Sequence, residues 1–271
     1  MSIGSPFPES LRRGQDHAIL DVSAPGFPPA THPAEPDLFS RQQAMPGHDQ
    51  TRLEAAHIVV VGCGGLGSWM AVALARMGVR RLTLINPDVF DRSNAPRQYM
   101  LPNDLGAPKA HALARHVAGH MLNAGTVTGI AGGVPDALDL LRERPSGLLV
   151  GVDNNQARLA VAQYARDRGV PVAVAMLSAD GRRAQALLQQ RGGPCLSCLL
   201  PNLDPDQAAP CAAASMPSCL LIGAHAVSML TACIMGGPNT PTWRETSLDG
   251  STERVGAPAV RPDCPCQGDQ P

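Results

Sequence analysis

A cluster of glycines follows a run of β-branched residues early in the chain. Residues 58–61 read Ile-Val-Val-Val, residues 62–67 read Gly-Cys-Gly-Gly-Leu-Gly, and an amphipathic segment covers residues 68–77. This order predicts a strand, a tight turn and a helix. Glycine lets the backbone turn sharply and approach a phosphate without a Cβ in the way, and the first N–H groups of the helix then face the anion. The pattern predicts a nucleotide site, although binders of NAD, FAD and ATP share it.

Polar and charged residues follow a second predicted strand and help to distinguish these nucleotides. Asn86 and Asp88 end that strand, and Arg97 and Lys109 lie further along the chain. A nicotinamide enzyme needs one acidic residue here for the ribose, but it needs no Arg and Lys beyond it. A triphosphate bound with Mg²⁺ needs added positive charge at the far end of the same pocket. The spacing therefore favours ATP, with a nicotinamide oxidoreductase as the alternative.

Two close pairs of cysteines suggest a metal centre. Cys195 and Cys198 are separated by two residues, and Cys264 and Cys266 by one. Four thiolates in two close pairs suit a tetrahedral structural Zn²⁺ site, although the single-residue spacing of the second pair gives a tighter bite. The alternatives are reduced free thiols or, less favoured because no helix follows Cys195 at once, a redox pair.

The composition limits the possible partners and compartments. Of 271 residues, 44% are hydrophobic and 17% charged, which is enough for a sizeable core, and the net charge is −1. This balance gives no electrostatic reason to expect nucleic acid or an anionic membrane as a partner. The N-terminus lacks the apolar run of a signal peptide, and residues 219–235 read as a buried helix rather than a membrane span. We expect a cytoplasmic protein, where cysteines serve metal binding or catalysis before disulfides.

The hydrophobic pattern alternates strands with helices. Strands are predicted at residues 57–61, 81–86, 126–130, 147–152 and 171–175, and helices at residues 66–78, 107–122, 135–143 and 155–168. Such alternation indicates a parallel sheet with helices on both faces, which binds ligands beyond the carboxyl ends of its strands. Asn86, Asp88 and Asp153 should therefore converge on one crevice.

The N-terminal segment has a different character. Residues 1–36 contain seven of the 26 prolines and show no clear periodicity. We predict a disordered or loosely attached extension, with a partner-docking segment as the alternative. Further along the chain, His116 and His120 are four residues apart on a predicted helix. Because no third ligand is evident, a solvated or partly packed helix face is favoured over a metal site.

In combination these motifs resemble the ThiF/MoeB/HesA family, the bacterial relatives of ubiquitin-activating enzymes. The resemblance covers roughly residues 38–266, and the matching stretches are residues 39–42, 62–67, 86–88, 94–98, 106–109, 152–154 with Arg158, and the two cysteine pairs. It implies a Rossmann-like, doubly wound, mainly parallel α/β sheet in an adenylation domain over residues 37–271. It also implies that Cys195, Cys198, Cys264 and Cys266 bind zinc and pin a C-terminal extension to the sheet.

The resemblance further implies an ATP-dependent adenylyltransferase. Such an enzyme joins AMP to the C-terminal carboxylate of a small ubiquitin-like or sulfur-carrier protein ending in Gly-Gly, and it releases pyrophosphate. By the same resemblance, ATP and Mg²⁺ are bound by Arg41, Gly62, Gly64, Gly65, Gly67, Asn86, Asp88, Asn94, Arg97, Lys109, Asp153 and Asn154. The residues implied to be catalytic are Arg97, Lys109, Asp153 and Cys211.

Individual positions carry further expectations. In the family, the arginine matching Arg41 reaches the triphosphate of a neighbouring protomer, which implies a homodimer; the alternative is a surface arginine. Asn86 stands where the family usually has an aspartate that holds the ribose. Cys211 matches a reactive cysteine that accepts an acyl group or forms a persulfide link in some members, whereas adenylation alone suffices in others. The remaining cysteines, Cys63, Cys219 and Cys233, are expected to pack in the core.

Two other functions stay open. A dehydratase branch of the same family activates a threonylcarbamoyl group on transfer RNA, and residues 67–69 and 73–76 resemble that branch. The Cys-x-x-Cys pair and the near-neutral charge favour a carrier protein instead. The third possibility is an ATP-binding scaffold without turnover, which Asn86 and the shortened cysteine pair would indicate.

Overall fold

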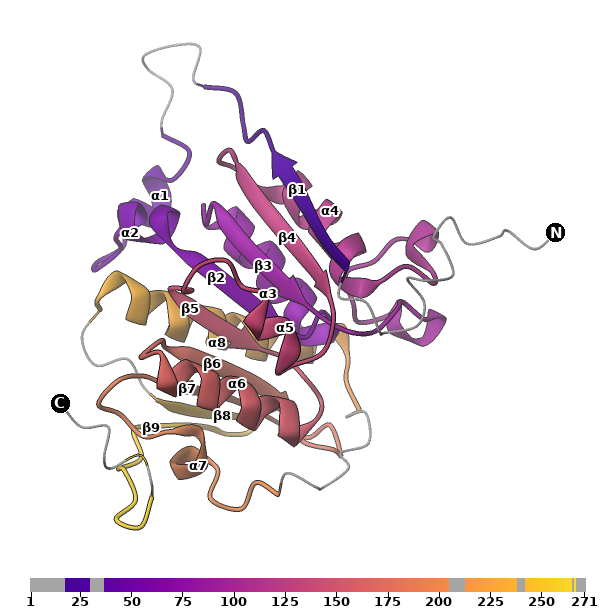
Figure 1. Ribbon diagram of the computed structural model, residues 1–271. Helices are drawn as coiled ribbons and strands as arrows, with labels where there is room; N and C mark the ends of the chain where they lie inside the picture. The colour runs from indigo at the N-terminus through magenta and orange to yellow at the C-terminus, as the bar shows by residue number, and fades with distance from the viewer. Residues whose placement is uncertain (1–17, 30–36, 205–212, 238–241, 265, 267–271) are drawn as a thin grey trace.

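The computed structural model describes residues 18–29, 37–204, 213–237, 242–264 and 266. Over these residues the chain forms a mixed α/β structure around one sheet of nine strands, in the order β1-β4-β3-β2-β5-β6-β7-β8-β9 (Figure 1). The strands are β1 (Ala18–Ala24), β2 (His57–Val61), β3 (Arg81–Ile85), β4 (Gly125–Ala131), β5 (Gly147–Val150), β6 (Val172–Leu177), β7 (Arg183–Gln189), β8 (Trp243–Ser247) and β9 (Glu253–Gly256). The α-helices are α1 (Ser40–Gln43), α2 (Gln50–Ala55), α3 (Gly65–Arg76), α4 (Lys109–His120), α5 (Asp136–Asp139), α6 (Asn155–Asp167), α7 (Leu196–Leu199) and α8 (Met216–Met235).

The centre of the sheet has the predicted doubly wound arrangement. Strands β4, β3, β2, β5 and β6 run parallel, and the strand order reverses direction along the chain between β2 and β5. The expectation of a mainly parallel sheet is wrong, because β1 and β7 to β9 pair antiparallel. The connections from β6 to β7 and from β8 to β9 span only about five residues each, and such short turns join only antiparallel strands.

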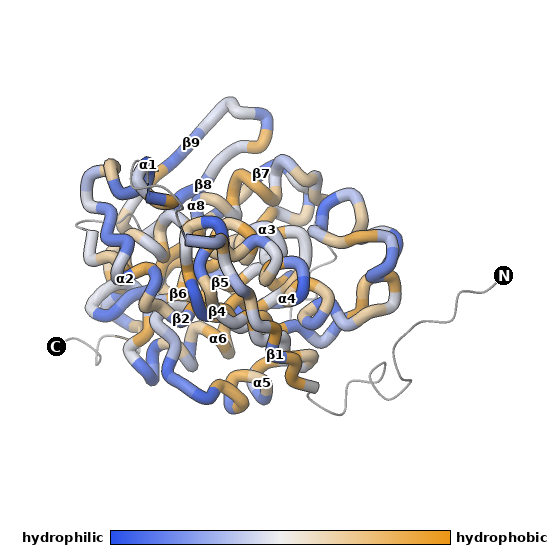
Figure 2. The backbone as a smooth tube through the Cα atoms, turned by 90° about the horizontal axis from the view of Figure 1, so that it is seen from above, coloured by the Kyte–Doolittle hydropathy of each residue, from blue (hydrophilic) through white to orange (hydrophobic). Residues whose placement is uncertain are grey.

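Alternating side chains on the strands build two separate layers of core. On β2, Ile58 and Val60 pack with α3, α4 and α8, whereas Val59 and Val61 pack on the α6 side. Because both faces are covered, β2 is apolar at consecutive positions rather than at every second one. The β9 end of the sheet, with three of its four residues exposed, projects from the body of the molecule (Figure 2).

Most predicted elements lie where the sequence pattern places them, and one helix is much shorter. The strand at residues 57–61 is confirmed with the same bounds, and α3, α4 and α6 match their predictions within two residues at each end. The helix predicted at residues 135–143 is wrong in length, because α5 covers only Asp136–Asp139. Beyond it, Leu140 and Leu141 pack against the sheet core instead of continuing the helix.

The N-terminal segment requires a larger correction. The prediction of a loosely attached extension is wrong for residues 18–24, because β1 pairs with β4 from Ala18 opposite Ala131 to Ala24 opposite Gly125. No proline interrupts residues 9–24, so a strand can form there. Ile19, Asp21 and Ser23 are exposed, whereas Leu20 and Val22 between them are half-buried, which is the period of a half-covered strand. Residues 1–17 and 30–36 lie outside the described part of the chain.

The longest described helix, α8, belongs to the core. Ser215 caps its N-terminus and Gly236, with φ +80°, ends it in the left-handed conformation. Among the described helices it alone is long and apolar enough to cross a membrane, and half of that apolar stretch is buried. It packs against α3 and beneath β5, β6 and β7, as expected for the buried helix predicted at residues 219–235.

The connection from β2 to α3 depends on two glycines that nearly touch. Gly62 has φ +92°, a conformation that favours glycine. Five residues later, a Cβ on Gly67 would lie 1.6 Å from the carbonyl oxygen of Gly62. The first turn of α3 can therefore sit on the end of β2 only when residue 67 has no side chain.

This contact predicts a large effect of a single methyl group. Gly67→Ala should lower the free energy of unfolding by about 3 kcal/mol, because strand and helix must separate to admit the Cβ. Gly119→Ala, in α4 with no atom within 4 Å of the added Cβ, is the matched control and should stabilise the protein by about 0.5 kcal/mol. Urea denaturation followed by circular dichroism measures both. Equal midpoints for the two variants would contradict the proposed constraint.

Candidate functional site

A cavity of about 480 Å³ opens beyond the carboxyl ends of β2, β3, β5 and β6. This is where a doubly wound sheet binds its ligands, at the point where strand order reverses. Ten of the residues singled out from the sequence line it: Gly62, Gly64, Gly65, Asn86, Asp88, Asn94, Arg97, Lys109, Asp153 and Asn154. The predicted convergence of the strand-end residues is therefore confirmed.

The floor of the cavity is the glycine turn. Gly64 precedes the first residue of α3 and has no side chain to cap the helix, so the first N–H groups of α3 are left to a ligand. Beside the turn, the side-chain oxygen of Asn86 accepts the N–H of Cys63 at 2.8 Å. The Asn86 Nδ2 group is buried and has no hydrogen-bond partner among the described residues. A ligand that accepts a hydrogen bond would satisfy it.

Positive charge enters the cavity from two different elements. The Lys109 ammonium, on the first residue of α4, is largely buried and lies 3.2 Å from the Asp88 carboxylate. The Arg97 guanidinium donates to the carbonyl of Ser93 at 2.7 Å. The side chain of Asn94 accepts the N–H of Asp91 at 3.1 Å and so shapes the short turn that precedes Arg97. The two cations and the α3 N-terminus together form a site suited to a polyanion.

The opposite wall follows β5 and contains Asp153. Asn154 caps α6 by accepting the N–H of Ala157 at 2.7 Å, so its oxygen has a structural task. Arg158 is buried and donates to the carbonyl of Val152 at 2.7 Å and to Asn155 at 2.6 Å. Burial lowers the pKa of Arg158, and the charge of Asp153 opposes this shift. A carboxylate at a cavity edge is the kind of ligand through which proteins bind a hydrated Mg²⁺ ion.

Several cavity residues were not assigned to the site from the sequence. Gln98 and Arg158 belong to motifs that the resemblance includes, so the signal was available. Cys219 is 1% exposed, as expected for a packing residue, yet it also lines the cavity beside Gly65. Residues 176–179, Leu203 and Ala214 also line the cavity, and none of them belongs to a motif singled out from the sequence.

Two predicted site residues do not line the cavity, and a third lies outside the described residues. Arg41 lies on α1, but its side chain is exposed and does not line the cavity. Gly67 lies behind the floor, against Gly62. Cys211 lies outside the described residues. Of the other cysteines, Cys63 is fully buried, which raises the pKa of its thiol to about 12, and Cys233 is half-buried.

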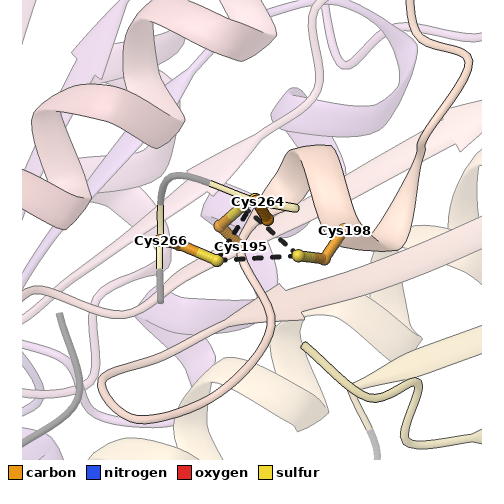
Figure 3. Close-up of side chains that lie close together, drawn as sticks. All are labelled: Cys195, Cys198, Cys264 and Cys266. Carbon is orange, nitrogen blue, oxygen red and sulfur yellow. Dashed lines mark hydrogen bonds between the residues drawn. The ribbon is translucent and has the colours of Figure 1, made fainter. Parts of the chain in front are cut away.

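The four cysteines of the two pairs meet in one buried cluster (Figure 3). The Sγ–Sγ distances are 3.8 Å for Cys195–Cys198, 3.4 Å for Cys195–Cys264, 3.6 Å for Cys198–Cys266 and 3.3 Å for Cys264–Cys266. Four thiolates about 2.3 Å from a tetrahedral Zn²⁺ ion would have their sulfurs about 3.8 Å apart. The donor set and its size therefore fit a structural metal ion, with the shortest distance in the pair separated by one residue.

His116 and His120 do not face each other as a ligand pair. The His116 ring is 2.7 Å from the Asp104 carboxylate, and the His120 ring is 2.7 Å from the Tyr99 hydroxyl. Among the described residues, the cysteine cluster is the one group of three or more His, Cys, Asp or Glu side chains close enough to share a metal ion.

Sequence comparison finds relatives with named activities. A sulfur carrier protein adenylyltransferase of Thermus thermophilus is 32% identical over 257 residues, covering 88% of this chain and 92% of the relative. The SAMP-activating enzyme E1 of Haloferax volcanii is 32% identical over 173 residues, covering 61% of this chain and 62% of the relative. Adenylyltransferase and sulfurtransferase MOCS3 of Bos taurus is 33% identical over 207 residues, and the match covers 72% of this chain and only 44% of that longer protein.

The fold itself also has solved relatives. MccB of E. coli, in a crystal structure with AMPCPP and MccA, superposes with a TM-score of 0.72 over 85% of this chain and 74% of that one. At 21% identity this similarity supports the fold. The ThiF family profile matches residues 39–267, which include the glycine turn, the cationic residues of the cavity and the cysteine cluster. The chain therefore belongs to the ThiF family.

Proposed function

We propose that this protein is an ATP-dependent adenylyltransferase that activates the C-terminal carboxylate of a small ubiquitin-like or sulfur-carrier protein. The observation that carries the proposal is the single cavity that combines the glycine turn, Arg97, Lys109 and Asp153. The named activities of the relatives in Thermus thermophilus and Haloferax volcanii agree with this chemistry. The acceptor would end in Gly-Gly, as the family resemblance implies.

The reaction makes a poor electrophile reactive. A carboxylate oxygen of the acceptor attacks the α-phosphorus of ATP, the bond from that phosphorus to the pyrophosphate oxygen breaks, and an acyl-adenylate results. Negative charge moves onto the leaving pyrophosphate, and Arg97 and Lys109 stabilise it. Asp153 would hold the Mg²⁺ ion, which neutralises phosphate charge when bound. The protein contributes positioning and electrostatic stabilisation more than covalent chemistry.

The ribose is expected to bind at Asn86, with the hydrogen bond in the opposite direction to the one that the family's usual aspartate forms. The Asn86 oxygen already accepts the Cys63 N–H, and its other polar atom is the unpartnered Nδ2 donor. A ribose hydroxyl would therefore accept a hydrogen bond here, whereas an aspartate would accept one from the hydroxyl. A neutral hydrogen bond is weaker than one to a carboxylate, so the selection for ribose over deoxyribose should be modest.

Other parts of the proposal extend beyond the cavity. We propose that Arg41 reaches the triphosphate of a neighbouring protomer in a homodimer, which agrees with its position away from the cavity of its own chain. We also propose that Cys211 accepts the acyl group after adenylation, with release of AMP. Residues 37–271 would form one adenylation domain, in which Zn²⁺ pins the C-terminal segment. A reducing compartment such as the cytoplasm suits a cluster of metal-binding thiolates.

The proposal is tested by Mg²⁺-dependent exchange of labelled pyrophosphate into ATP. The wild-type protein should catalyse exchange only when offered a small protein that ends in Gly-Gly. Asp153→Ala should lower the rate at least a hundredfold, and Asp136→Ala, an exposed residue of α5, should leave it unchanged. Exchange with threonylcarbamoyl transfer RNA instead would indicate the dehydratase activity, and ATP binding without any exchange would indicate a scaffold.

The role of Asn86 predicts a change in nucleotide selectivity. Asn86→Asp should raise the ratio of the dissociation constants for 2′-deoxy-ATP and ATP about tenfold, because a charged acceptor then bonds the ribose hydroxyls. Isothermal titration calorimetry with both nucleotides and Mg²⁺ measures the ratio within each protein, so a general loss of affinity cancels. An unchanged ratio would place the ribose elsewhere.

Metal analysis tests the cysteine cluster. The purified protein should contain about one Zn²⁺ per chain, as for other four-thiolate sites. Cys264→Ser should remove most of the metal and lower the thermal unfolding midpoint, since the segment around residue 264 would lose its link to α7. Cys233→Ser, a half-buried cysteine outside the cluster, is the control and should keep the metal. Mass spectrometry of the metal content decides between bound zinc and four free thiols.

A further inference from the structure

Arg97 belongs to a segment with very little regular structure. Between β3 and α4, the chain forms only two single 3₁₀ turns, at Arg92–Asn94 and Pro102–Asp104. A long side chain on such a segment reaches a fixed point only when the backbone beneath it is fixed. The structure shows five side chains that do this, which we call the anchor cluster: Trp69, Tyr99, Asp104, His116 and His120.

The anchor cluster first joins the Arg97 backbone to α3. The indole Nε1–H of Trp69 donates to the carbonyl oxygen of Arg97 at 3.0 Å. Two residues later, the N–H of Tyr99 donates to the fully buried hydroxyl of Ser68 at 3.0 Å. The Trp69 and Tyr99 rings meet edge to face with their centroids 5.2 Å apart. Adjacent residues of α3 therefore hold the backbone on both sides of Gln98.

The same segment is joined to α4 by the remaining members of the cluster. The Tyr99 hydroxyl lies 2.7 Å from Nε2 of His120, and its ring contacts both histidine rings edge to face. His116 Nε2 lies 2.7 Å from the Asp104 carboxylate, which also accepts the N–H of Leu101 at 2.6 Å. Burial, with the charges of Arg76 and His116, lowers the pKa of His120, so a neutral ring is favoured as the acceptor for the tyrosine hydroxyl.

These contacts have a consequence for the phosphate site. The helices that hold the cluster, α3 and α4, are also the helices whose first turns supply Gly65 and Lys109 to the cavity. We propose that the anchor cluster is the positioning device that fixes Arg97 relative to these two helix N-termini, so that the three phosphate-binding elements keep one geometry. This inference rests on the proposed function, because it assigns Arg97 to the bound triphosphate.

A double-mutant cycle tests the coupling between the cluster and Arg97. Trp69→Phe removes the indole donor and keeps an aromatic ring against Tyr99. It should weaken Mg²⁺-ATP binding about fivefold in the wild-type background and less than twofold in the Arg97→Ala background. Trp243→Phe, on β8 and away from the cavity, is the matched control and should leave the affinity unchanged. Isothermal titration calorimetry gives the four dissociation constants without an identified acceptor.

The results separate this inference from the proposed function. An equal loss of affinity in both backgrounds would overturn the positioning role of Trp69, while ATP binding by the wild type would stand. No binding of Mg²⁺-ATP by the wild type would overturn the proposed function and the inference together. If circular dichroism shows that Trp69→Phe does not fold, Tyr99→Phe replaces it in the same cycle, because that change removes only the hydroxyl bond to His120. The control is then Tyr164→Phe, on α6.

Discussion

The close approach of Gly67 to the carbonyl oxygen of Gly62 is the contact on which the rest of the site depends. It places the first turn of α3 directly over the end of β2, and the helix N–H groups then point into the space beyond the sheet. Every other feature of the cavity is arranged around that point. A side chain at Gly67 would separate the helix from the strand, and one at Gly62 would collide with the backbone of Gly151 after β5, before any ligand was involved.

The parallel strands bring the remaining groups to the same place. Each of β2, β3, β5 and β6 ends at one edge of the sheet, so residues that follow these strands converge although they lie far apart in sequence. The cations reach the cavity differently. Lys109 comes from the start of a helix, whereas Arg97 comes from an irregular segment that owes its position to contacts with α3 and α4.

The cysteine cluster has a different role, which is to connect distant parts of the chain. Cys195 precedes α7 and Cys198 lies within it, beside β7, and Cys264 and Cys266 follow the β8–β9 hairpin. A metal ion there would stabilise a region with few apolar contacts, where the cluster's apolar neighbour is Val260. Most residues that line the cavity precede β7, whereas the cysteine cluster begins after β7. The metal and the nucleotide would therefore serve separate tasks.

The sequence by itself determined the central strands and helices, the glycine turn and ten of the cavity residues, because these depend on local periodicity and on residue types that single positions require. It did not predict β1, β7, β8 and β9 or the short α5, since the outer strands of this sheet and the ends of helices are set by what they pack against. Only the tertiary structure placed Cys219, Leu203 and residues 176–179 in the cavity, and only it showed that His116 and His120 anchor the Arg97 segment. Such contacts join residues that are distant in sequence, and no local pattern specifies the partner.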